Sequence, residues 1–495
     1  MFFILFSATL LLLAVNRLYR YVASRASLPY PPGPPGDFII GNLRHMPSKY
    51  SWLIFTEWAR KYGPINYINV AGEPILIINT QEAALDLLEK RSAIYSDRPR
   101  FVMACELGGL DRLVSLMSYC PEHRRQRKIL AQALNPLVVA RDYVPIQERF
   151  VHQLAKHLLD DPEDFLGHFD RCIGNMIQAI TYGEDDDVDF VALGRINAMH
   201  IKRIVRGYIV EFLPWLKYIP QWFPGAQFHR DARASKEDLE RTKWLPYNTV
   251  KAKAGNGTAS PSYVLTALNA MKTAKAGDID DHLISMTASA LYSSGADSTA
   301  GSLSTLIFAM LLHPDVQARV QAELDGVFGA HLPSIASRDS TPYLNAVIME
   351  TFRWRPPVPV GIPHRLEQDD VYNGYFIPAG TRILVNVWAI LQNEQRFPDS
   401  AKFDPDRFLF DSPPSQATSA SRLDPVTTVL GYGRRACPGI HVVQSGLWIT
   451  MATILYCFNI RPKVDSKTMK PMIPELEFTG NSLRYVRFPE SCVRH

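Results

Sequence analysis

Helical periodicity dominates the hydrophobic pattern of this chain, and strand-like alternation is confined to a few short runs. The clearest strand-like runs are INYINVAG and PILIIN, which meet at a Gly-Glu-Pro sequence that predicts a turn. The longest helical pattern covers residues 279–312, with Asp278 and Asp280 as candidate N-caps and His313-Pro314 as its end. The pattern therefore predicts a mainly α-helical fold with a small β region.

The predicted long helix is apolar on all sides, which is typical of a helix buried in a large core. Gly295 and Gly301 lie in its middle, although glycine inside a helix costs about 1 kcal/mol relative to alanine. Two explanations are open: a groove for a ligand that lies close to the backbone, or the close approach of another helix. A second helix, over residues 313–329, has its charges on one face and is expected at the surface.

The amino-terminal run MFFILFSATLLLLAV is apolar apart from one serine and one threonine, and arginines follow it closely. No positive residue precedes this run and no small-residue cleavage site follows it, which favours an uncleaved membrane anchor over a signal peptide. The charges after the span place the rest of the chain in the cytosol by the positive-inside rule. We therefore expect a single-pass anchor at residues 1–18, a basic and proline-rich hinge at 19–40 and one domain at 41–495.

Composition narrows the classes of protein that the chain can belong to. A formal net charge of +4 on 495 residues is too small to indicate a nucleic-acid partner, which needs a clustered excess of Lys and Arg. At 47% hydrophobic residues, the chain can bury a large core. The six cysteines are scattered, without a CxxC pair, so we expect a reducing compartment rather than a disulfide framework.

Cys437 has the most informative surroundings of the six cysteines. It lies in the run LGYGRRACPGIHV, whose three glycines allow tight backbone turns. Pro438 and the apolar residues after it predict that the cysteine directly precedes a helix. There, amide N–H groups and the positive helix end stabilise a thiolate. A buried structural cysteine is the other interpretation of a single residue of this kind.

The spacing of Leu430, Gly433, Arg435, Cys437 and Gly439 resembles the haem-binding loop of the cytochrome P450 family, F-x-x-G-x-R-x-C-x-G. Leu430 stands where the family usually has Phe. The resemblance implies the cytochrome P450 fold, with a long central helix over a buried haem b (iron protoporphyrin IX). It also implies that Cys437 is the axial ligand of the haem iron and that Arg435 contacts the haem.

Further segments resemble the family in the same order along the chain. Glu350 and Arg353 match its E-x-x-R pair on one helix face, and Arg407 in FDPDRF matches the third member of that network. The resemblance gives these three residues a structural role behind the cysteine loop.

Two basic segments resemble the parts of the family that bind the haem propionates. PEHRRQRK offers His123 and Arg127, which are four residues apart and so share one helix face. GIPHRLEQDD offers His364 and Arg365, of which His364 fits the family's spacing better. A solvated basic surface is the alternative interpretation of each segment.

On the long helix, SSGADSTAG resembles the family's oxygen-binding motif. The resemblance implies that Gly295 makes room for dioxygen, that Asp297 connects the pocket to solvent protons and that a hydroxyl assists O–O cleavage. The family's usual threonine aligns with Ser298, and Thr299 follows it. Successive residues on a helix point about 100° apart, so only one of these hydroxyls can face the iron. Ser298 is favoured, and Thr299 stays open.

The resemblance implies a monooxygenase that inserts one oxygen atom of O2 into a substrate. No flavin or dinucleotide motif follows Pro31, so the electrons must come from elsewhere. The resemblance to anchored, cytosol-facing members implies that NADPH supplies them through a separate cytochrome P450 reductase. Arg124, Arg125, Lys128 and Arg434 are candidate contacts for its acidic surface. Such an anchored member is expected as a monomer in the endoplasmic reticulum membrane, with its catalytic domain in the cytosol.

The expected substrate is a lipophilic small molecule that partitions from the membrane. The candidate pocket segments FVMACELGGL, PPVPVGIP and EFTGNS are mainly apolar. EFLPWLKYIPQWFPG, with Trp215, Trp222 and Phe223, is expected to dip into the bilayer surface. Several segments resemble fungal members of the family that tailor secondary metabolites such as terpenoids or polyketides.

Two other functions are compatible with a haem-binding loop. One is an isomerase or dehydratase that rearranges oxidised lipids without external electrons, and the other is a haem carrier without catalysis. The pair Asp297 and Ser298 argues against both, since neither function needs a proton relay. Dependence of turnover on NADPH distinguishes the monooxygenase from the isomerase.

Overall fold

The computed structural model describes residues 28–472, apart from 185–187, 189, 191–192, 195, 197–198, 200–207, 212, 276, 410–423, 465–467 and 469. The side chains of residues 296–298 are not described either. The expected anchor at residues 1–18 and the segment EFTGNS therefore lie outside the described residues.

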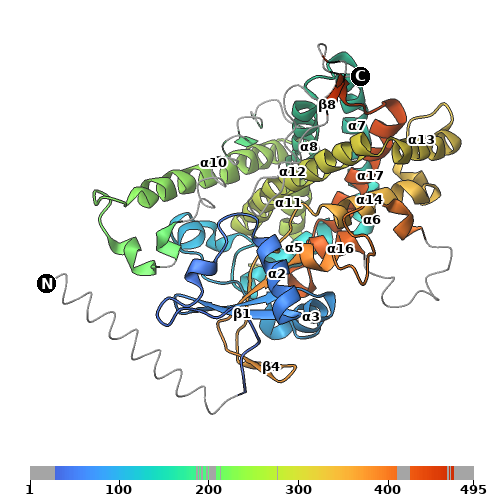
Figure 1. The fold of residues 1–495 in the computed structure, drawn as a ribbon. Coiled ribbons are helices and arrows are strands. Elements are labelled where there is room, and N and C mark those ends of the chain that lie inside the picture. Colours follow the sequence, from blue (N-terminus) through green and yellow to red (C-terminus); the bar gives the residue numbers. More distant parts are fainter. Residues whose placement is uncertain are drawn as a thin grey trace. The chain divides into compact units, whose positions relative to one another are not determined.

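The described chain is mainly helical with a few short strands, which confirms the predicted fold class (Figure 1). It divides into two compact units, each assembled from separate stretches of sequence. The first unit comprises Met1–Pro99, Pro359–Asn393 and Tyr432–Arg435, and the second comprises Arg100–Val358, Glu394–Gly431 and Ala436–His495. The expectation of one domain over 41–495 stays a prediction.

A four-stranded sheet of order β1-β2-β6-β3 is the centre of the first unit. β1 and β2 are antiparallel, β6 runs parallel to β2, and β3 is antiparallel to β6. The strands are β1 (Ile65–Val70), β2 (Glu73–Ile78), β3 (His364–Arg365), β6 (Arg382–Val385) and the separate hairpin of β4 (Asp370–Tyr372) and β5 (Tyr375–Ile377). The helices are α2 (Ser51–Tyr62), α3 (Gln81–Ala84), α4 (Ser92–Tyr95) and α15 (Val387–Leu391).

The turn between β1 and β2 differs from the predicted Gly-Glu-Pro turn. Ala71 and Gly72 make the turn with φ values of 49° and 97°. Two successive residues with positive φ are typical of the tightest hairpin loops. Glu73 and Pro74 are therefore the first residues of β2, where they pair with Val70 and Asn69.

The described part of the proline-rich run packs against the first unit as an extended segment. The N–H groups of Phe376 and Tyr67 donate to the carbonyls of Pro29 (2.8 Å) and Pro32 (3.1 Å). The ring of Tyr30 stacks on that of Tyr67 with centroids 4.8 Å apart. A Cβ atom at Gly33 would overlap the Tyr67 carbonyl oxygen, so this close approach requires glycine. These contacts hold the run along the edge of β1.

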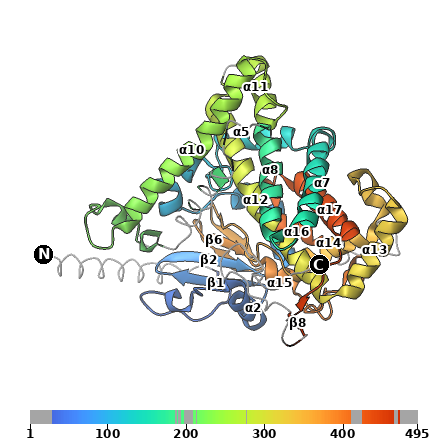
Figure 2. The ribbon, with the colours of Figure 1, turned by 90° about the horizontal axis from the view of Figure 1, so that it is seen from above.

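Helices build the second unit around one large hydrophobic core (Figure 2). Its helices are α5 (Pro121–Ala133), α6 (Pro136–Val138), α7 (Val144–Asp160), α8 (Phe165–Tyr182), α10 (Gln227–Gly255), α11 (Tyr263–Thr273), α12 (Asp281–Leu312), α13 (Pro314–Phe328), α14 (Pro342–Trp354), α16 (Pro425–Leu430) and α17 (Ile440–Cys457). A short pair of strands, β7 (Lys463–Val464) and β8 (Pro471–Met472), also belongs to it.

The predicted long helix is α12, and α8 packs along it. The carboxylate of Asp280 accepts the N–H of Leu283 at 2.7 Å, so Asp280 is the N-cap. A Cβ atom at Gly295 would lie 3.0 Å from the Ile177 side chain of α8. One of the two explanations for this glycine therefore holds, because another helix, α8, approaches it closely. The expected amphipathic helix after it is α13, whose buried face includes Val320 and Leu324.

By length and composition, α12 and α17 could each cross a membrane. However, 87% and 67% of their most apolar windows are buried inside the protein. Both are therefore core helices of the second unit.

Candidate active site

The loop around Cys437 closes on itself ahead of α17. The N–H of Cys437 donates to the carbonyl of Leu430, the last residue of α16, at 2.8 Å. Gly439 is the N-cap residue of α17, which begins at Ile440. The cysteine therefore lies directly before a helix, as its sequence predicts. From α5, Nη1 of Arg127 donates to the carbonyl of Ala436 at 2.7 Å and so ties that helix to the loop.

Opposing influences act on the Cys437 thiol. Burial raises its pKa, whereas the N–H of Gly439 and the charge of Arg127 lower it. At Cys172, burial is the only influence, and it raises the pKa to about 12. Cys437 thus has a donor and a cation that favour the thiolate, and a metal cation bound to the sulfur would deprotonate it outright. This donor set fits a thiolate ligand of iron.

Behind this loop, Glu350 and Arg353 form an ion pair whose side chains are 0% exposed. Arg353 makes two hydrogen bonds to the Glu350 carboxylate, at 2.6 and 2.7 Å. It also donates to the carbonyls of Ser400 (2.8 Å) and Lys402 (3.0 Å). Nε of Arg407 lies 3.6 Å from the same carboxylate, so the three residues expected to form one network do so.

The two residues expected on α5 lie on one face of that helix. His123 is buried, and its ring contacts the ring of Tyr119 with centroids 5.5 Å apart. Arg127 is partly buried, and burial lowers its pKa. Both residues therefore lie on the side of α5 that faces the protein rather than the solvent.

His364 and Arg365 differ in their surroundings, although they are neighbours in β3. His364 is buried, and its Nδ1 lies 2.9 Å from the carbonyl oxygen of Tyr95. Burial first, and then the charge of Arg98, lowers its pKa to about 3. The Arg365 side chain is 42% exposed and pairs with Asp97 at 2.5 Å. Arg365 is already paired with Asp97 at the surface. His364, which is buried, is therefore the better candidate for contact with a buried ligand.

Arg98 is a candidate carboxylate-binding residue that the sequence alone did not suggest. It is 5% exposed, and its Nη1 donates to the carbonyls of Ile362 (2.8 Å) and Pro363 (2.6 Å). Burial and the charge of Arg435 lower its pKa to about 9. The only sequence signal is its position in SDRPRF, directly before a candidate pocket segment.

The first unit thus gathers Arg98 and Arg435 closely enough that their charges repel each other, and the two guanidinium groups also keep the neighbouring His364 neutral. Nε of Arg435 is fixed by a 2.7 Å hydrogen bond to the Ser96 carbonyl. Burying like charges is costly unless an anion joins them. The cluster therefore fits a ligand with carboxylates, such as the two propionates of haem.

Part of the motif on α12 lies among the described side chains. The Thr299 hydroxyl is buried and donates to the carbonyl of Gly295 at 2.8 Å. Residues four apart share a helix face, so Thr299 lies on the face of α12 where Gly295 meets α8. The side chains of Asp297 and Ser298 lie outside the described residues. The roles of all four residues stay predictions.

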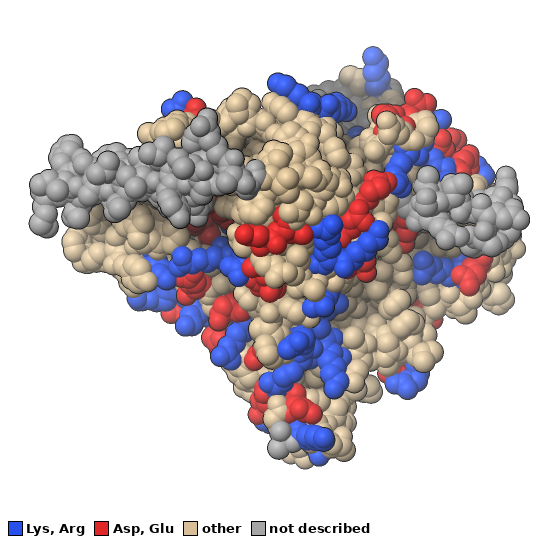
Figure 3. Space-filling model, turned by 90° about the horizontal axis from the view of Figure 1, so that it is seen from below, with Lys and Arg blue, Asp and Glu red and all other residues tan. Residues whose placement is uncertain are grey.

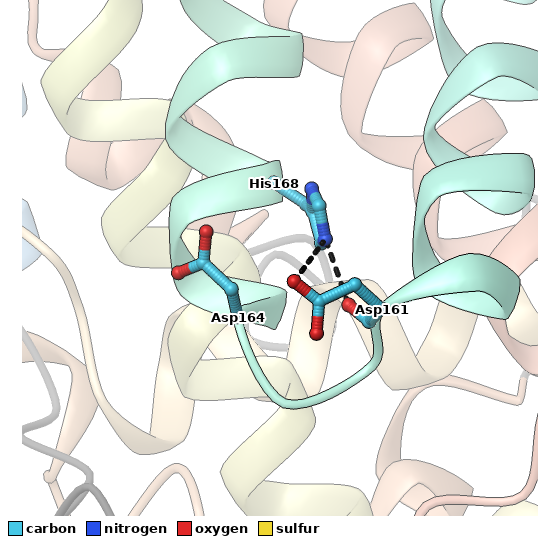
Figure 4. Close-up of side chains that lie close together, drawn as sticks. All are labelled: Asp161, Asp164 and His168. Atoms are coloured by element: carbon cyan, nitrogen blue, oxygen red, sulfur yellow. Dashed lines mark hydrogen bonds and ion pairs between the residues drawn. The ribbon is translucent and has the colours of Figure 1, made fainter.

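In the described part of the chain, one group of His, Cys, Asp and Glu side chains has spacing that could hold a metal ion: Asp161, Asp164 and His168 (Figure 4). Arg171 donates to Nδ1 of His168 at 2.7 Å, so Nε2 carries the proton that bonds the Asp161 carbonyl at 2.7 Å. Arg171 also pairs with Asp164 at 2.9 Å. Because both ring nitrogens are used and a cation is already present, the group is a structural junction between α7 and α8.

A mainly helical protein with a long buried helix and a thiolate loop directly before another helix has the features of a haem-thiolate enzyme. The sequence matches the family model "Cytochrome P450" over residues 31–485. The chain therefore belongs to the cytochrome P450 family.

Relatives of the chain include fungal enzymes of that family. It is 36% identical to "Cytochrome P450 monooxygenase 98" of Postia placenta, over 95% of this chain and 91% of the relative. It is 38% identical to "Tryptamine 4-monooxygenase" of Psilocybe cyanescens, over 93% and 91%. A zebra fish cytochrome P450 solved with progesterone shares the fold, with a TM-score of 0.73, 22% identity and coverage of 88% and 97%. The chain is thus an oxidoreductase of the monooxygenase class, a class that uses haem and O2.

We expect Arg353→Lys to destabilise the protein strongly. Lysine cannot reproduce the forked contact, and leaving Glu350 without its full partner in a buried site costs about 3–5 kcal/mol. The measurement is the midpoint of thermal unfolding by circular dichroism. Arg141→Lys is the control, because Arg141 pairs with Asp142 at the surface, and its midpoint should match wild type. Equal midpoints for both variants would contradict the structural role of the network.

Proposed function

We propose that this protein is a membrane-anchored monooxygenase that inserts one oxygen atom of O2 into a lipophilic small molecule, with electrons from NADPH through a separate reductase. The observation that carries the proposal is the Cys437 loop, where a thiol with an amide donor and a nearby cation precedes α17. When bound, haem supplies the chemistry of O2 activation at a thiolate-ligated iron.

The proposed roles of the site residues follow from their chemistry. Cys437 ligates the iron, and Leu430, which carries the carbonyl that orients the cysteine N–H, stands beside it in place of the family's Phe. Arginine and histidine side chains would bind the haem propionates: Arg98, His123, Arg127, His364 and Arg435. Arg365 is assigned instead to its ion pair with Asp97.

We assign the proton-delivering hydroxyl to Ser298 rather than Thr299. The Thr299 hydroxyl already donates its proton to Gly295 on the face of α12 that packs against α8. Ser298 is rotated about 100° from that face. Asp297 then relays protons from solvent, and Thr299 holds the helix backbone in place.

The proposed location is the cytosolic face of the endoplasmic reticulum membrane, with residues 1–18 as the anchor. A second membrane contact is supported by residues 209–223, which we call the aromatic segment. Trp215, Tyr218 and Trp222 are 60%, 79% and 80% exposed there. From 212 to 230 the sequence contains no Asp or Glu. Exposed Trp and Tyr side chains in a stretch of sequence that contains no Asp or Glu are typical of a surface that lies at a bilayer interface.

The proposed substrate class is a fungal secondary metabolite, such as a terpenoid or polyketide. The two relatives named above are fungal, and one of them is named "Tryptamine 4-monooxygenase". The candidate pocket segments of this chain are mainly apolar, which supports a lipophilic substrate. Feeding such metabolites with and without NADPH tests both the substrate class and the monooxygenase activity, because an isomerase would turn over without NADPH.

Cys437→Ser should abolish the thiolate-type absorption band of the reduced, carbon monoxide-bound protein, because serine oxygen cannot replace the thiolate. The measurement is the difference spectrum of the full chain expressed with a reductase. Cys457→Ser is the control, since Cys457 is exposed at the end of α17, and it should keep the band. A thiolate band that persists in Cys437→Ser would overturn the proposal.

Ser298→Ala should divert NADPH from product to hydrogen peroxide, because the proton path is broken. Thr299→Val removes the other hydroxyl at nearly constant shape and should keep coupling close to wild type, at a stability cost of about 0.5–1.5 kcal/mol. The measurement is peroxide released per NADPH oxidised with a substrate identified by feeding. If Thr299→Val uncouples and Ser298→Ala does not, the assignment is wrong.

The reductase contact is proposed on α5, where Arg124 and Lys128 are exposed. Lys and Arg side chains are interspersed with Asp and Glu side chains on the face of the molecule drawn in Figure 3. Arg125 is a weaker candidate, because it donates to the carbonyls of Gly277 and Asp278 and pairs with Asp280. An acidic partner surface would meet the exposed pair first.

Arg124→Glu combined with Lys128→Glu should therefore slow reduction of the iron by the reductase and weaken its dependence on salt. Stopped-flow reduction at two ionic strengths measures both effects. Arg230→Glu combined with Lys236→Glu, exposed on α10, is the charge-matched control and should reduce at the wild-type rate. An unchanged rate in the α5 variant would remove this surface from the proposal.

A further inference from the structure

A small cavity lies in the second unit, where α14 meets α16, α17 and the short helix η8 (Ile335–Ser340). Its volume is about 120 Å³. Its polar lining consists of one cation, one carboxylate and two amides: Arg338, Asp424, Asn345 and Gln444. Ile348, Phe352 and Leu447 belong to its apolar lining and are buried. One water molecule needs about 10–15 Å³ of such space, so the cavity has room for a molecule of several non-hydrogen atoms.

The backbone of Arg338 is held in place, whereas the end of its side chain is available to a ligand. Its carbonyl accepts the hydroxyl of Thr341 and the side-chain amide of Asn345, each at 2.9 Å. Nε of Arg338 donates to the side-chain oxygen of Asn345 at 3.4 Å. Within the described part of the chain, its two Nη nitrogens have no hydrogen-bond partner. Burial lowers the pKa of this guanidinium, and the charges of Asp339 and Asp424 act against that effect.

Asp424 brings a negative charge to the same cavity. Its Oδ1 accepts the N–H of Val426 at 2.8 Å, so that Asp424 is also the N-cap of α16. Burial raises its pKa, whereas backbone N–H groups and the charge of Arg338 lower it. No ion pair joins Arg338 to Asp424 among the side chains that the structure describes, although their charges act on each other. Opposite charges thus line one cavity without a direct contact.

This lining defines the kind of molecule that fits. The forked end of an arginine binds a planar carboxylate through two parallel hydrogen bonds. The Asp424 carboxylate can accept a proton from an ammonium group, and an apolar side chain can cover Phe352 and Leu447. A ligand with only one charge would leave the other protein charge partly buried and without a partner, which is costly. A small apolar amino acid has all three groups.

We propose that this cavity is a binding site for a small zwitterion of the apolar α-amino acid class, with its carboxylate on Arg338 and its ammonium group on Asp424. None of the residues assigned above to haem or O2 lines the cavity. The site is therefore additional to the proposed reaction and does not depend on it.

The position of the cavity gives its ligand an effect on the cysteine loop. Val426 lies in α16, whose last residue, Leu430, accepts the N–H of Cys437. Gln444 lies in α17, which begins shortly after that cysteine. A ligand in the cavity thus joins the two helices on either side of Cys437 and restrains the loop between them.

Isothermal titration calorimetry of the full chain with haem tests the site, with L-leucine as the probe. Isocaproate lacks the ammonium group of leucine, and isoamylamine lacks its carboxylate. The iron is occupied by 4-phenylimidazole, so that the amine cannot bind there. One L-leucine should bind per chain, at least about tenfold more tightly than either analogue, because each analogue loses one charge-assisted contact. Equal affinities for the three probes, or no heat of binding at millimolar leucine, would overturn the proposal.

Two variants assign the charges separately. Arg338→Gln should abolish the preference for L-leucine over isoamylamine and keep the preference over isocaproate. Asp424→Asn keeps a side chain that caps helices and should show the reverse. Arg141→Gln, at the surface, is the control and should keep both preferences. Because each variant loses a different preference, a general loss of folding cannot imitate this result. Two variants that keep both preferences would overturn the assignment.

Hydrogen exchange with mass spectrometry tests the effect on the loop. Saturating L-leucine should slow exchange severalfold in peptides covering residues 425–431 and 436–447 of wild type, and not in Arg338→Gln. Unchanged exchange in wild type with leucine bound would overturn this effect. The carbon monoxide difference spectrum should stay at wild type in both cavity variants, so failure of this inference is distinguishable from failure of the proposed haem-thiolate function.

Discussion

Burial of the Glu350–Arg353 pair is the constraint on which the candidate site depends. A guanidinium with no access to water must find an acceptor for each of its donors, or its desolvation is not offset. Arg353 finds them in one carboxylate and in the carbonyls of Ser400 and Lys402, while Glu350 also accepts the N–H of Asp404 at 2.7 Å. Satisfying this single pair therefore fixes an otherwise irregular stretch of chain against α14.

Much of this arrangement could be predicted from the sequence, because it depends on local patterns. The all-round apolar character of residues 279–312 identified α12, and Asp280 was recognisable as its cap. The position of Cys437 before a helix followed from Pro438 and the apolar run after it. These features involve residues that are near one another in sequence, where periodicity and capping act directly.

Other features depend on contacts between distant residues and could not be predicted in this way. Arg98 is a buried guanidinium whose acceptors are the carbonyls of residues 362 and 363, far from it in sequence. The sequence left two explanations open for the glycine at 295, and only the contact with Ile177 of α8 distinguishes them. The turn between β1 and β2 was predicted at Gly-Glu-Pro, but it begins at Ala71. The sequence did not suggest this, because the left-handed backbone conformation of Ala71 is uncommon for alanine. Tertiary contacts decided each of these cases.

The cationic cluster in the first unit has a consequence for the life of the protein in the cell. On the proposed assignment, Arg98 and Arg435 repel each other beside His364 until two carboxylates lie among them. A ligand that binds only the folded chain stabilises it by mass action. The amount of intact protein would then follow the supply of haem, because the chain without its ligand is less stable and more open to degradation.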